Sequence, residues 1–445
     1  MHEPIISVGI LSAKKISFTL FGDFQIGNQT ITHSGICHAE LKDGAIVCFV
    51  NNVRLAESEK ITFSPSNPES EYFTLKDVII GSKFHWEKKE KQSFKGSITL
   101  LVDHQIIHAI NNVSLEEYLK SVISSEMSPK CSLGFLKAHA IISRSWVLSQ
   151  IEKREKSLPN LFNSTESTSA GEVIKWYDRE EHQHFDVCAD DHCQRYQGTT
   201  KIHTTTVDQA IDNTAGLVLT YKNNICDARF SKCCGGRSES FENVWANTPH
   251  EYLTPVIDYK FEPDEMELDL RIEKNSREWI KSFPKTFCNT NEKRVLEQIL
   301  PYNDQSTKDF FRWSVTYTQS KLSSLIKEKT GMDLGSIIDL IPVERGHSGR
   351  IIKLKIVGSS KSIILGKELE IRKALSQTHL YSSAFFVEKS NLENGIAQTF
   401  KFNGAGWGHG VGLCQIGAAV MAEQGYNFDE ILLHYYKNAK IVKIY

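Results

Sequence analysis

The first quarter of the chain consists of short apolar runs separated by turn residues. Between residues 4 and 112 these runs include IISVGI, ISFTLF, AIVCFV, ITLLV and IIHAI, and Gly, Asn, Ser or Pro stands between them. Runs of β-branched and aromatic residues of this length predict strands. We therefore expect an N-terminal β region, which as a domain would cover about residues 1–95.

The apolar period then changes from that of strands to that of helices. The pattern predicts a helix over about 114–127, where Ser114 and Glu117 have the spacing of a capping box. Pro129 is expected to end it, because proline cannot continue a helix. A second helical run follows at 133–156.

The middle of the chain is less regular. Residues 156–215 are polar and are expected to form a loop, and strand patterns return at 217–221 and 227–231. Residues 259–345 carry charged helical patterns such as DEMELDLRIEKNSREWIKSF. We expect this segment to be an inserted helical subdomain.

The last hundred residues return to a mixed pattern. Strand runs in RIIKLKIVG and SAFFVEK precede a glycine-rich stretch, and two helices are predicted at about 413–424 and 428–437. Asn427 and Glu430 have the spacing of a second capping box, and Gly425 stands where a left-handed helix end is common. The chain as a whole is therefore predicted to be an α+β protein.

Composition narrows the range of functions. The chain has 445 residues, of which 40% are apolar and 24% are charged, and its formal net charge is −2. This length predicts two or three domains, or one core with large insertions. No long basic run marks a surface for nucleic acid, because KKEKQ at 88–92 is the kind of run that a solvated loop carries. We therefore expect no nucleic-acid partner.

Targeting signals are also not evident in the sequence. No stretch approaches 18 consecutive apolar residues, so we expect no membrane-spanning helix. The N-terminal stretch MHEPIISVGILSAKK lacks the basic start and the small-residue cleavage site of a signal peptide. The ten cysteines do not form the regular framework of a small secreted protein, and the pairs 188/193 and 233/234 favour metal binding or local packing.

Glu126 is the first candidate for catalysis. In the expected helix, Tyr118, Val122 and Glu126 are spaced four residues apart and lie on one face. A carboxyl at the C-terminal end of a helix faces the negative end of the helix dipole, and both this dipole and partial burial favour the protonated form that a general acid needs. The alternative is that Glu126 points into solvent beyond the last turn.

Two polar residues interrupt the second helical run. A guanidinium is seldom buried without a partner, so Arg144 is either one half of a structural ion pair or a contact to substrate. A histidine such as His139 on a mostly apolar helix is more often a hydrogen-bonded core residue than a ligand.

HQHFDVCADDHC at 182–193 is the strongest metal candidate. It places three histidines and two cysteines in a polar loop. Zinc takes four such ligands in tetrahedral sites, and a loop with little core of its own gains most from such a site. Four donors favour a closed structural site over a catalytic one. The expected ligands are Cys188, His192, Cys193 and either His182 or His184; the alternative is two free thiols or a disulfide.

FSKCCGGRSES at 230–240 combines adjacent cysteines with a glycine turn. Neighbouring side chains point apart in most backbones, so Cys233 and Cys234 are expected to be packing residues rather than a catalytic pair. Lys232 is a candidate for a polar contact in a groove.

Glycine is densest in GAGWGHGVG at 404–412, around Trp407 and His409. Glycine permits positive φ angles and a close approach to the backbone, so we expect a sugar or peptide to lie along this loop, with an aromatic ring to stack on it. No Lys-Ser/Thr follows, and the spacing is that of neither a P-loop nor a dinucleotide fingerprint, which argues against a nucleotide site.

Five stretches, taken in order, resemble the SpoIID/LytB family of stage II sporulation proteins and amidase enhancers. They are SLEEYLKSVISSEM, FLKAHAIISRSWVL, DVCADDHCQRYQG, SKCCGGRSE and GWGHGVGLCQIGAAVMAEQGYNFDEILLHYYKNAKI. The resemblance runs from about residue 96 to the C-terminus apart from 259–345. It implies a SpoIID-like core in two parts, 96–258 and 346–445.

The resemblance also implies an activity, that of a peptidoglycan lytic transglycosylase acting on glycan strands stripped of their peptides. The glutamate of the family's YL-x-G-V-x-x-E-M motif falls on Glu126, and the arginine of its A-R-T-Y motif falls on Arg144. The family's Cys and His loop, which binds zinc in some members, falls on 182–193. The residues expected to contact glycan are Arg144, His139, Lys232, Trp407 and His409.

The same resemblance allows a second function from a different class. An amidase enhancer would bind glycan without cleaving it and would modulate a separate cell-wall amidase. A third possibility is a descendant of the fold that binds another oligosaccharide. Peptidoglycan glycan strands are the expected partner in the first two cases. The family implies the cell envelope, whereas the N-terminal stretch has no signal-peptide features, so no location is predicted.

Overall fold

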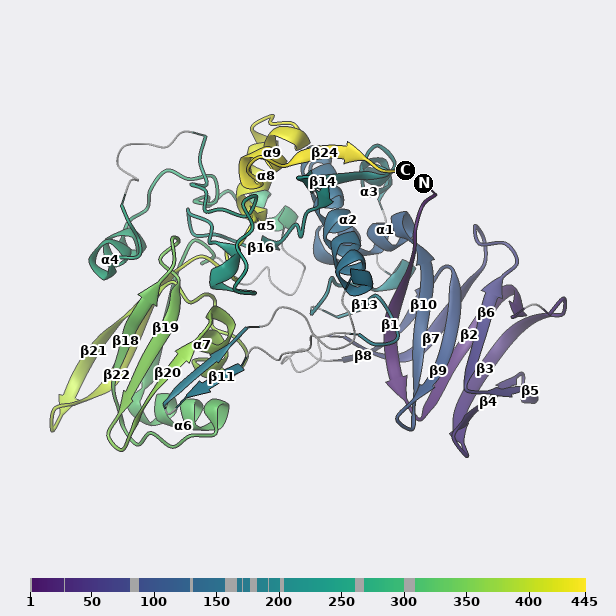
Figure 1. The fold of residues 1–445 in the computed structure, drawn as a ribbon, viewed down its shortest axis with the longest axis horizontal. Helices are drawn as coiled ribbons and strands as arrows, with labels where there is room; N and C mark the ends of the chain where they lie inside the picture. Colours follow the sequence, from purple (N-terminus) through teal and green to yellow (C-terminus); the bar gives the residue numbers. More distant parts are fainter. Residues whose placement is uncertain are drawn as a thin grey trace. The chain divides into compact units, whose positions relative to one another are not determined.

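The chain divides into two compact units, each of mixed α and β structure as predicted (Figure 1). Unit 1 comprises residues 1–154, 181–218 and 442–445, and unit 2 comprises residues 155–180 and 219–441. The computed structural model describes residues 2–27, 29–80, 88–128, 131–156, 166–169, 171–176, 182–190, 192–200, 204–260, 268–299 and 309–445.

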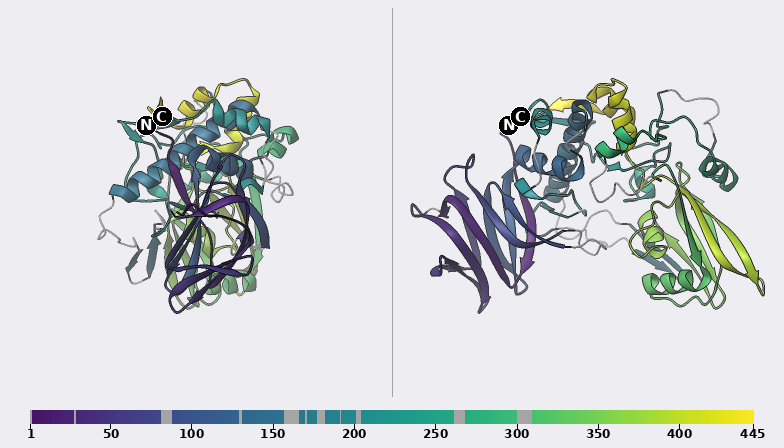
Figure 2. Two further views of the ribbon diagram at one scale, coloured as in Figure 1. Left: turned by 90° about the vertical axis from the view of Figure 1, so that its right-hand side faces the viewer. Right: turned by 180° about the vertical axis from the view of Figure 1, so that it is seen from behind.

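Unit 1 is built on a twisted, mainly antiparallel sheet (Figures 1 and 2). Among the described residues the strands follow the order β13-β1-β10-β9-β6-β2-β3-β4-β5, and β7 pairs with β2 and β8. In β2, Ile16, Phe18 and Leu20 are buried and the residues between them are less so, which is the alternation of a strand with one face on a core. The strand bounds are β1 (Ile5–Ala13), β2 (Lys15–Ile26), β3 (Thr32–Lys42), β4 (Ala45–Val50), β5 (Val53–Ser58), β6 (Lys60–Pro65), β7 (Tyr72–Ile80), β8 (Lys88–Phe94), β9 (Ser97–Asp103), β10 (Ile106–Ser114) and β13 (Val187–Cys188).

The helices of unit 1 all come after strand β10 in the sequence. They are α1 (Leu115–Glu126), α2 (Leu133–Lys156), η1 (Gly198–Thr200) and α3 (Thr205–Asp212), so part of the expected loop 156–215 is helical. Every residue from 138 to 150 in α2 is buried, including polar residues such as His139 and Arg144, so this part of the helix lies inside the protein on all sides.

The first capping box is not formed. Ser114 precedes α1 as expected, but its side chain makes no capping bond. The Glu117 carboxylate lies instead beside Lys120, at 2.9 Å, and Lys95, at 3.5 Å. The Glu117 side chain therefore forms ion pairs with these lysines instead of bonding the backbone N–H of Ser114. Pro129, expected to end the helix, lies outside the described residues.

Unit 2 holds its core between two sheets and the helices that cover them. The sheet orders among its described residues are β11-β12-β20-β19-β18 and β17-β22-β21, and β16 pairs with β23. Leu354, Ile356, Phe400 and Phe402 are buried at the centre of this core. The strand bounds are β11 (Glu166–Ser169), β12 (Glu172–Lys175), β16 (Phe230–Ser231), β17 (Arg312–Thr318), β18 (Ile337–Arg345), β19 (Ile351–Gly358), β20 (Ser362–Gly366), β21 (Phe385–Glu393), β22 (Ile396–Ala405) and β23 (Leu413–Cys414). β14 (Leu217–Tyr221), β15 (Asn224–Ile225) and β24 (Lys440–Lys443) form a separate three-stranded sheet, and the sequence boundaries between the two units fall within β14 and β24.

Residues 259–345, expected to be mainly helical, contain both kinds of element. Their strands β17 and β18 pair with β22 and β19, which follow residue 345 in the sequence. The second capping box is confirmed, since Asn427 and Glu430 each satisfy the other's backbone N–H at the start of α9. The helices are η2 (Phe241–Asn243), α4 (Glu273–Lys281), α5 (Lys293–Ile299), α6 (Gln319–Thr330), α7 (Glu368–Ala374), α8 (Gln415–Glu423) and α9 (Phe428–Tyr435).

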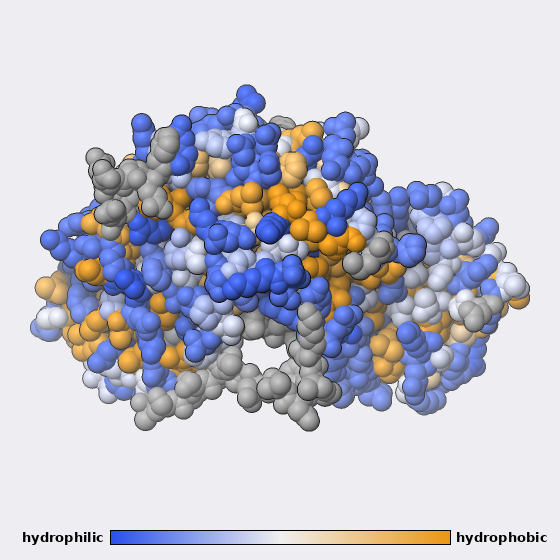
Figure 3. All heavy atoms as spheres, turned by 45° about the horizontal axis from the view of Figure 1, so that its top comes forward, coloured by the Kyte–Doolittle hydropathy of each residue, from blue (hydrophilic) through white to orange (hydrophobic). Residues whose placement is uncertain are grey.

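The surface is predominantly polar on the face shown in Figure 3, and apolar side chains gather there in separate patches. In the part of the chain that the structure describes, no helix has both the length and the apolar character that crossing a membrane requires.

Candidate functional site

Glu126 is the last residue of α1 and is half-buried. Tyr118 and Val122, which precede it on the same face of the helix, are fully buried. The Glu126 carboxylate accepts a hydrogen bond of 3.0 Å at Oε1 from the backbone N–H of Arg195. The side chain is therefore held at one oxygen and does not simply point into solvent.

The segment that supplies this N–H is itself fixed on α1. The ring of Tyr196 stacks on that of Tyr118, with centroids 5.2 Å apart. The backbone N–H of Gln197 donates to Ser121 Oγ over 3.1 Å. These contacts lay the segment along the helix, so the position of the Glu126 carboxylate depends on how the segment is anchored.

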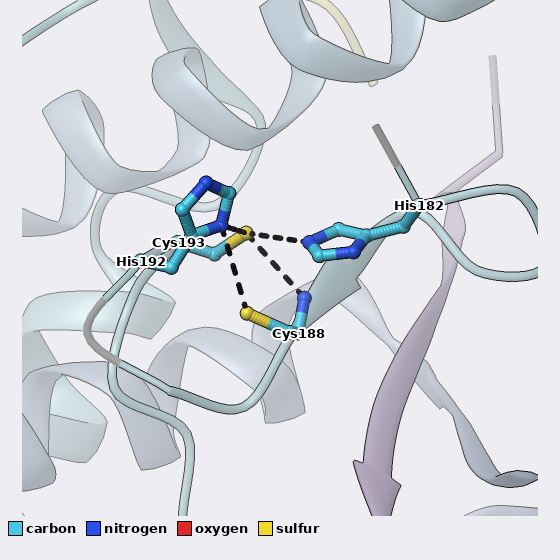
Figure 4. A group of neighbouring side chains, drawn as sticks. All are labelled: His182, Cys188, His192 and Cys193. Atoms are coloured by element: carbon cyan, nitrogen blue, oxygen red, sulfur yellow. Dashed lines mark hydrogen bonds between the residues drawn. The ribbon is translucent and has the colours of Figure 1, made fainter. Parts of the chain in front are cut away.

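The anchor on the N-terminal side of this segment is a group of Cys and His side chains. Figure 4 shows His182, Cys188, His192 and Cys193 pointing toward one another, and their ligand atoms all lie within 4.8 Å of each other. Hydrogen bonds from Cys193 and from the two histidines lower the pKa of the Cys188 thiol, despite its partial burial. These side chains can hold a metal ion, and Cys193 is two residues from Arg195.

His184, the other histidine considered as a ligand, is bound elsewhere. Its Nε2 lies 2.9 Å from Oδ2 of Asp103 in β9, and its ring is tilted against that of His108. Of the two histidines, His182 is therefore the one whose ring lies beside Cys188, His192 and Cys193.

Arg144 and His139 are not available to a substrate, so their expected glycan contacts do not fit the structure. Arg144 is 0% exposed, and its Nε and Nη2 donate to the Glu116 carboxylate over 3.0 and 2.6 Å. Its Nη1 donates to the carbonyl of Leu217 over 2.9 Å. His139 is equally buried and lies 3.3 Å from Ser143 Oγ through Nδ1. Both residues are internal parts of unit 1.

The glycine-rich stretch lies in unit 2, where protein atoms fill the space beside its glycines. Gly410 has φ of +79°, and a Cβ there would lie 2.4 Å from Cζ of Arg350. Gly412 has φ of +72°, and a Cβ there would lie 2.0 Å from the carbonyl oxygen of Arg229. The expectation that a sugar lies against the bare backbone is wrong at these two positions, because the chain's own turns and side chains require glycine.

Trp407 and Lys232 are half-buried and lie on neighbouring segments of unit 2. The Trp407 backbone pairs with that of Cys233, the residue after Lys232, in an antiparallel bridge. The Trp407 ring lies against those of Tyr381 and Phe310, with centroid distances of 4.5 and 4.8 Å. Trp407 is thus part of an aromatic group that its own fold holds in place.

His409 is held neutral in the same loop. Burial, together with the nearby guanidinium groups of Arg229 and Arg350, holds its pKa well below the usual range. Its Nδ1 accepts a hydrogen bond of 3.1 Å from the backbone N–H of Val411, and its ring meets the edge of Trp245. His409 can therefore take part in hydrogen bonds but is not set up to carry a proton near neutral pH.

The sequence reasoning missed a second group of possible metal ligands. Cys234, Asp258, Cys288 and Cys414 of unit 2 are all buried, and their ligand atoms lie within 4.8 Å of one another. They come from four separate segments, so no spacing motif announces them. The adjacent cysteines in SKCCGG were the one available signal. This group, too, could hold a metal ion.

Two family models match different parts of the chain. A family model described as "Stage II sporulation protein" matches residues 103–221, and one described as "Domain of unknown function (DUF8618)" matches residues 239–412. The first match contains Glu126 and the Cys/His group. Trp407 and His409 fall in the second match, and Lys232 falls between the two.

Similar proteins extend over most of the chain. An uncharacterized protein of Brachyspira hyodysenteriae is 27% identical over 78% of this chain and 72% of its own length. Stage II sporulation protein D of Bacillus amyloliquefaciens is 26% identical over 75% of this chain and 76% of its own length. The amidase enhancer of Bacillus subtilis is 25% identical over 72% of this chain, which spans only 39% of that protein. The chain therefore carries a SpoIID domain and is a distant homologue of stage II sporulation protein D and of the amidase enhancer.

Proposed function

We propose that this protein acts on the cell wall as a lytic transglycosylase, with Glu126 as its acid and base and peptide-free glycan strands as its substrate. One observation carries the proposal: Glu126, inside the SpoIID match, ends a buried helix with one carboxylate oxygen held by the Arg195 N–H. Among the described residues no hydrogen bond to the second oxygen is formed, so this oxygen is available for a substrate. A fixed and half-buried carboxyl is suited to proton transfer.

A single carboxyl can complete this reaction. Glu126 donates its proton to the glycosidic oxygen, and the C1–O bond to the leaving sugar breaks. The C6 hydroxyl of the muramic acid then attacks C1, and the Glu126 carboxylate accepts the hydroxyl proton. A 1,6-anhydro ring forms and no water is consumed. A hydrolytic glycosidase needs a second carboxyl to activate water or to act as nucleophile, whereas here the substrate supplies the nucleophile.

We propose further that His182, Cys188, His192 and Cys193 bind a structural zinc ion. In a tetrahedral site, a zinc–sulfur distance of 2.3 Å and a zinc–nitrogen distance near 2.0 Å put sulfur and nitrogen ligands about 3.6 Å apart. Three such pairs here lie 3.3, 3.6 and 3.9 Å apart. Four protein ligands leave no open position, so the ion would stabilise the loop that carries Arg195 rather than activate a substrate.

Lys232, Trp407 and His409 stay predictions as glycan contacts. Lys232 and Trp407 are partly accessible, and an ammonium group and an aromatic ring are both suited to binding the hydroxyls and faces of sugars. A neutral His409 would contribute a hydrogen bond only.

The decisive experiment is mass spectrometry of the products from peptide-free glycan strands. The wild-type protein is expected to release fragments with 1,6-anhydro-muramic ends, and Glu126→Gln is expected to release none. Glutamine retains an oxygen that can accept the Arg195 N–H, so the fold is expected to persist, but it has no acidic proton to give. Glu117→Gln is the matched control, because it removes the same charge from the same helix at a residue paired with Lys120. Equal cleavage by wild type and Glu126→Gln would rule out the proposed role.

The second candidate, an amidase enhancer, is favoured by the likeness to the protein of that name. It predicts that neither wild type nor Glu126→Gln cleaves glycan, while both bind it and both raise the rate of a cell-wall amidase. Binding is measured by sedimentation with purified glycan, and amidase activity by release of peptide from intact peptidoglycan.

A further inference from the structure

The buried group in unit 2 joins segments that are far apart in the sequence. Cys234 lies in the turn after β16, Cys288 follows α4, and Cys414 immediately precedes α8. The Cys234 and Cys288 sulfurs are 3.6 Å apart, and the Cys414 sulfur accepts a hydrogen bond of 3.2 Å from the backbone N–H of Cys234. Asp258 completes the group through Oδ2, which accepts from the N–H of Cys288 over 2.8 Å.

Asp258 is a buried carboxyl without an ion-pair partner among the described residues. Its side chain is 0% exposed, and its two oxygens accept hydrogen bonds from the Tyr435 hydroxyl and the Cys288 N–H. Among the described residues, no Lys, Arg or His forms an ion pair with it. Burying a carboxylate beside three sulfur atoms without a cation is costly. A divalent metal at the centre of the group would remove that cost.

The geometry suits one tetrahedral ion better than a disulfide. Two sulfurs bound to the same zinc ion lie about 3.8 Å apart, given a zinc–sulfur distance of 2.3 Å. The measured separation of 3.6 Å is close to this value and far from the bonded distance of a disulfide, about 2.05 Å. Thiolates with one carboxylate oxygen form a donor set that zinc accepts.

Two guanidinium groups lie next to the turn that carries Cys234. A zinc ion with three thiolates and one carboxylate has a net charge of −2. The Arg350 guanidinium donates to the carbonyl of Cys234 over 3.1 Å, and that of Arg312 donates to the carbonyl of Gly235 over 3.1 Å. These guanidinium groups therefore offset the negative charge next to the cluster.

We propose that Cys234, Asp258, Cys288 and Cys414 bind a second zinc ion with a structural role. The ion ties the SKCCGG turn to the start of α8, at the end of the glycine-rich loop. The parallel pairing of β16 with β23 brings the same two segments together. The metal thus holds the loop that carries Trp407 and His409, in the way that the Cys/His group of unit 1 holds the segment next to Glu126.

The test is the zinc content of the full-length protein, purified without chelator and measured by plasma emission spectrometry. The wild type is expected to contain two zinc ions per chain. Cys288→Ser is expected to contain one, and Cys193→Ser, in the unit 1 group, is also expected to contain one. Cys226→Ser is the matched control, because Cys226 is a buried cysteine of unit 2 outside the group, and it is expected to retain both ions. Full zinc content in Cys288→Ser would overturn the proposal.

A measurement on the wild type alone covers the case in which Cys288→Ser does not fold. Cadmium-113 exchanged into the protein is expected to give two NMR resonances. Cadmium shifts move downfield as sulfur ligands replace nitrogen and oxygen, so the three-sulfur site would appear downfield of the two-sulfur site of unit 1. A spectrum without the three-sulfur resonance refutes the second site. If Cys234 and Cys288 do not react with thiol reagents in the denatured chain, they form a disulfide, and the second zinc site is also refuted.

Discussion

Glu116→Gln is the substitution that tests most directly why the chain contains Arg144. The Glu116 carboxylate accepts two hydrogen bonds from the fully buried guanidinium, at 3.0 and 2.6 Å. It also accepts the backbone N–H of Gly216 over 3.2 Å and the hydroxyl of Tyr445. Glutamine cannot supply a negative charge, and its amide nitrogen would face a donor.

The expected cost follows from burial. Removing one partner of a buried ion pair costs about 3–5 kcal/mol, because the remaining charge stays buried without compensation. Glu116 itself retains 14% side-chain exposure, so we expect the lower end, about 3 kcal/mol. The neighbouring pair of Glu117 and Lys120 is more exposed, at 26% and 22%. Such pairs contribute about 0–1 kcal/mol, which makes Glu117→Gln the matched control.

The assay is hydrogen exchange of the amides in α2, followed by mass spectrometry, because the chain has two units and a global transition would mix them. A loss of about 3 kcal/mol accelerates exchange through unfolding on the order of a hundredfold. We also expect Glu116→Leu combined with Arg144→Met to be more stable than either single variant, since the double change leaves no buried charge. If Glu116→Gln exchanges no faster than Glu117→Gln, the structural account of Arg144 is wrong and a role at the surface must be reconsidered.

Two further predictions concern the glycine-rich loop. Gly410→Ala is expected to lower the stability of unit 2 by about 3 kcal/mol, because a Cβ at this positive φ meets Arg350. Gly395→Ala, with φ of +80° and open space around it, is expected to cost about 1 kcal/mol. Thermal melting compares the two variants, and equal losses of stability would contradict the packing argument. The folded protein holds the pKa of His409 well below its usual range. Below pH about 6.5 the unfolded chain therefore takes up a proton at His409 and the folded protein does not. The stability that is present above that pH is lost as the pH falls. Urea midpoints between pH 7.5 and 5.5 are expected to fall less in His409→Asn than in the wild type, and an imidazole NMR titration near pH 6.5 in the folded protein would contradict this.

Local patterns were sufficient to predict the elements that carry the Glu126 site. The apolar spacing in α1 and α2 is a property of neighbouring residues, so the bounds of both helices and the position of Glu126 at a helix end follow from the sequence. The capping box at Asn427 formed for the same reason. The one at Ser114 did not, because Glu117 pairs with Lys120 in the same helix and with Lys95 from a distant part of the chain.

Side chains whose partners are distant in the sequence could not be assigned in this way. The choice of His182 over His184 depends on Asp103, which lies in another strand. The buried state of Arg144 depends on Glu116 in the preceding helix. The group around Asp258 is created entirely by the fold, since its four members share no spacing. The glycine loop was misread because Arg350, which fills the space beside Gly410, is distant in the sequence.

The division of unit 1 into three stretches affects how it can be made and studied. Residues 442–445 belong to unit 1 although all of unit 2 precedes them in the sequence. During synthesis, unit 2 must therefore be complete before unit 1 can finish folding. A fragment cut at the limits of the SpoIID match, 103–221, would lack β1 and Tyr445 and would leave Glu116 without part of its shell. The two chain ends lie close together in Figures 1 and 2, and Glu3 and Tyr445 both contact Glu116. To make unit 1 alone, residues 442–445 would therefore be placed ahead of the N-terminus and a short linker would replace residues 155–180, which belong to unit 2.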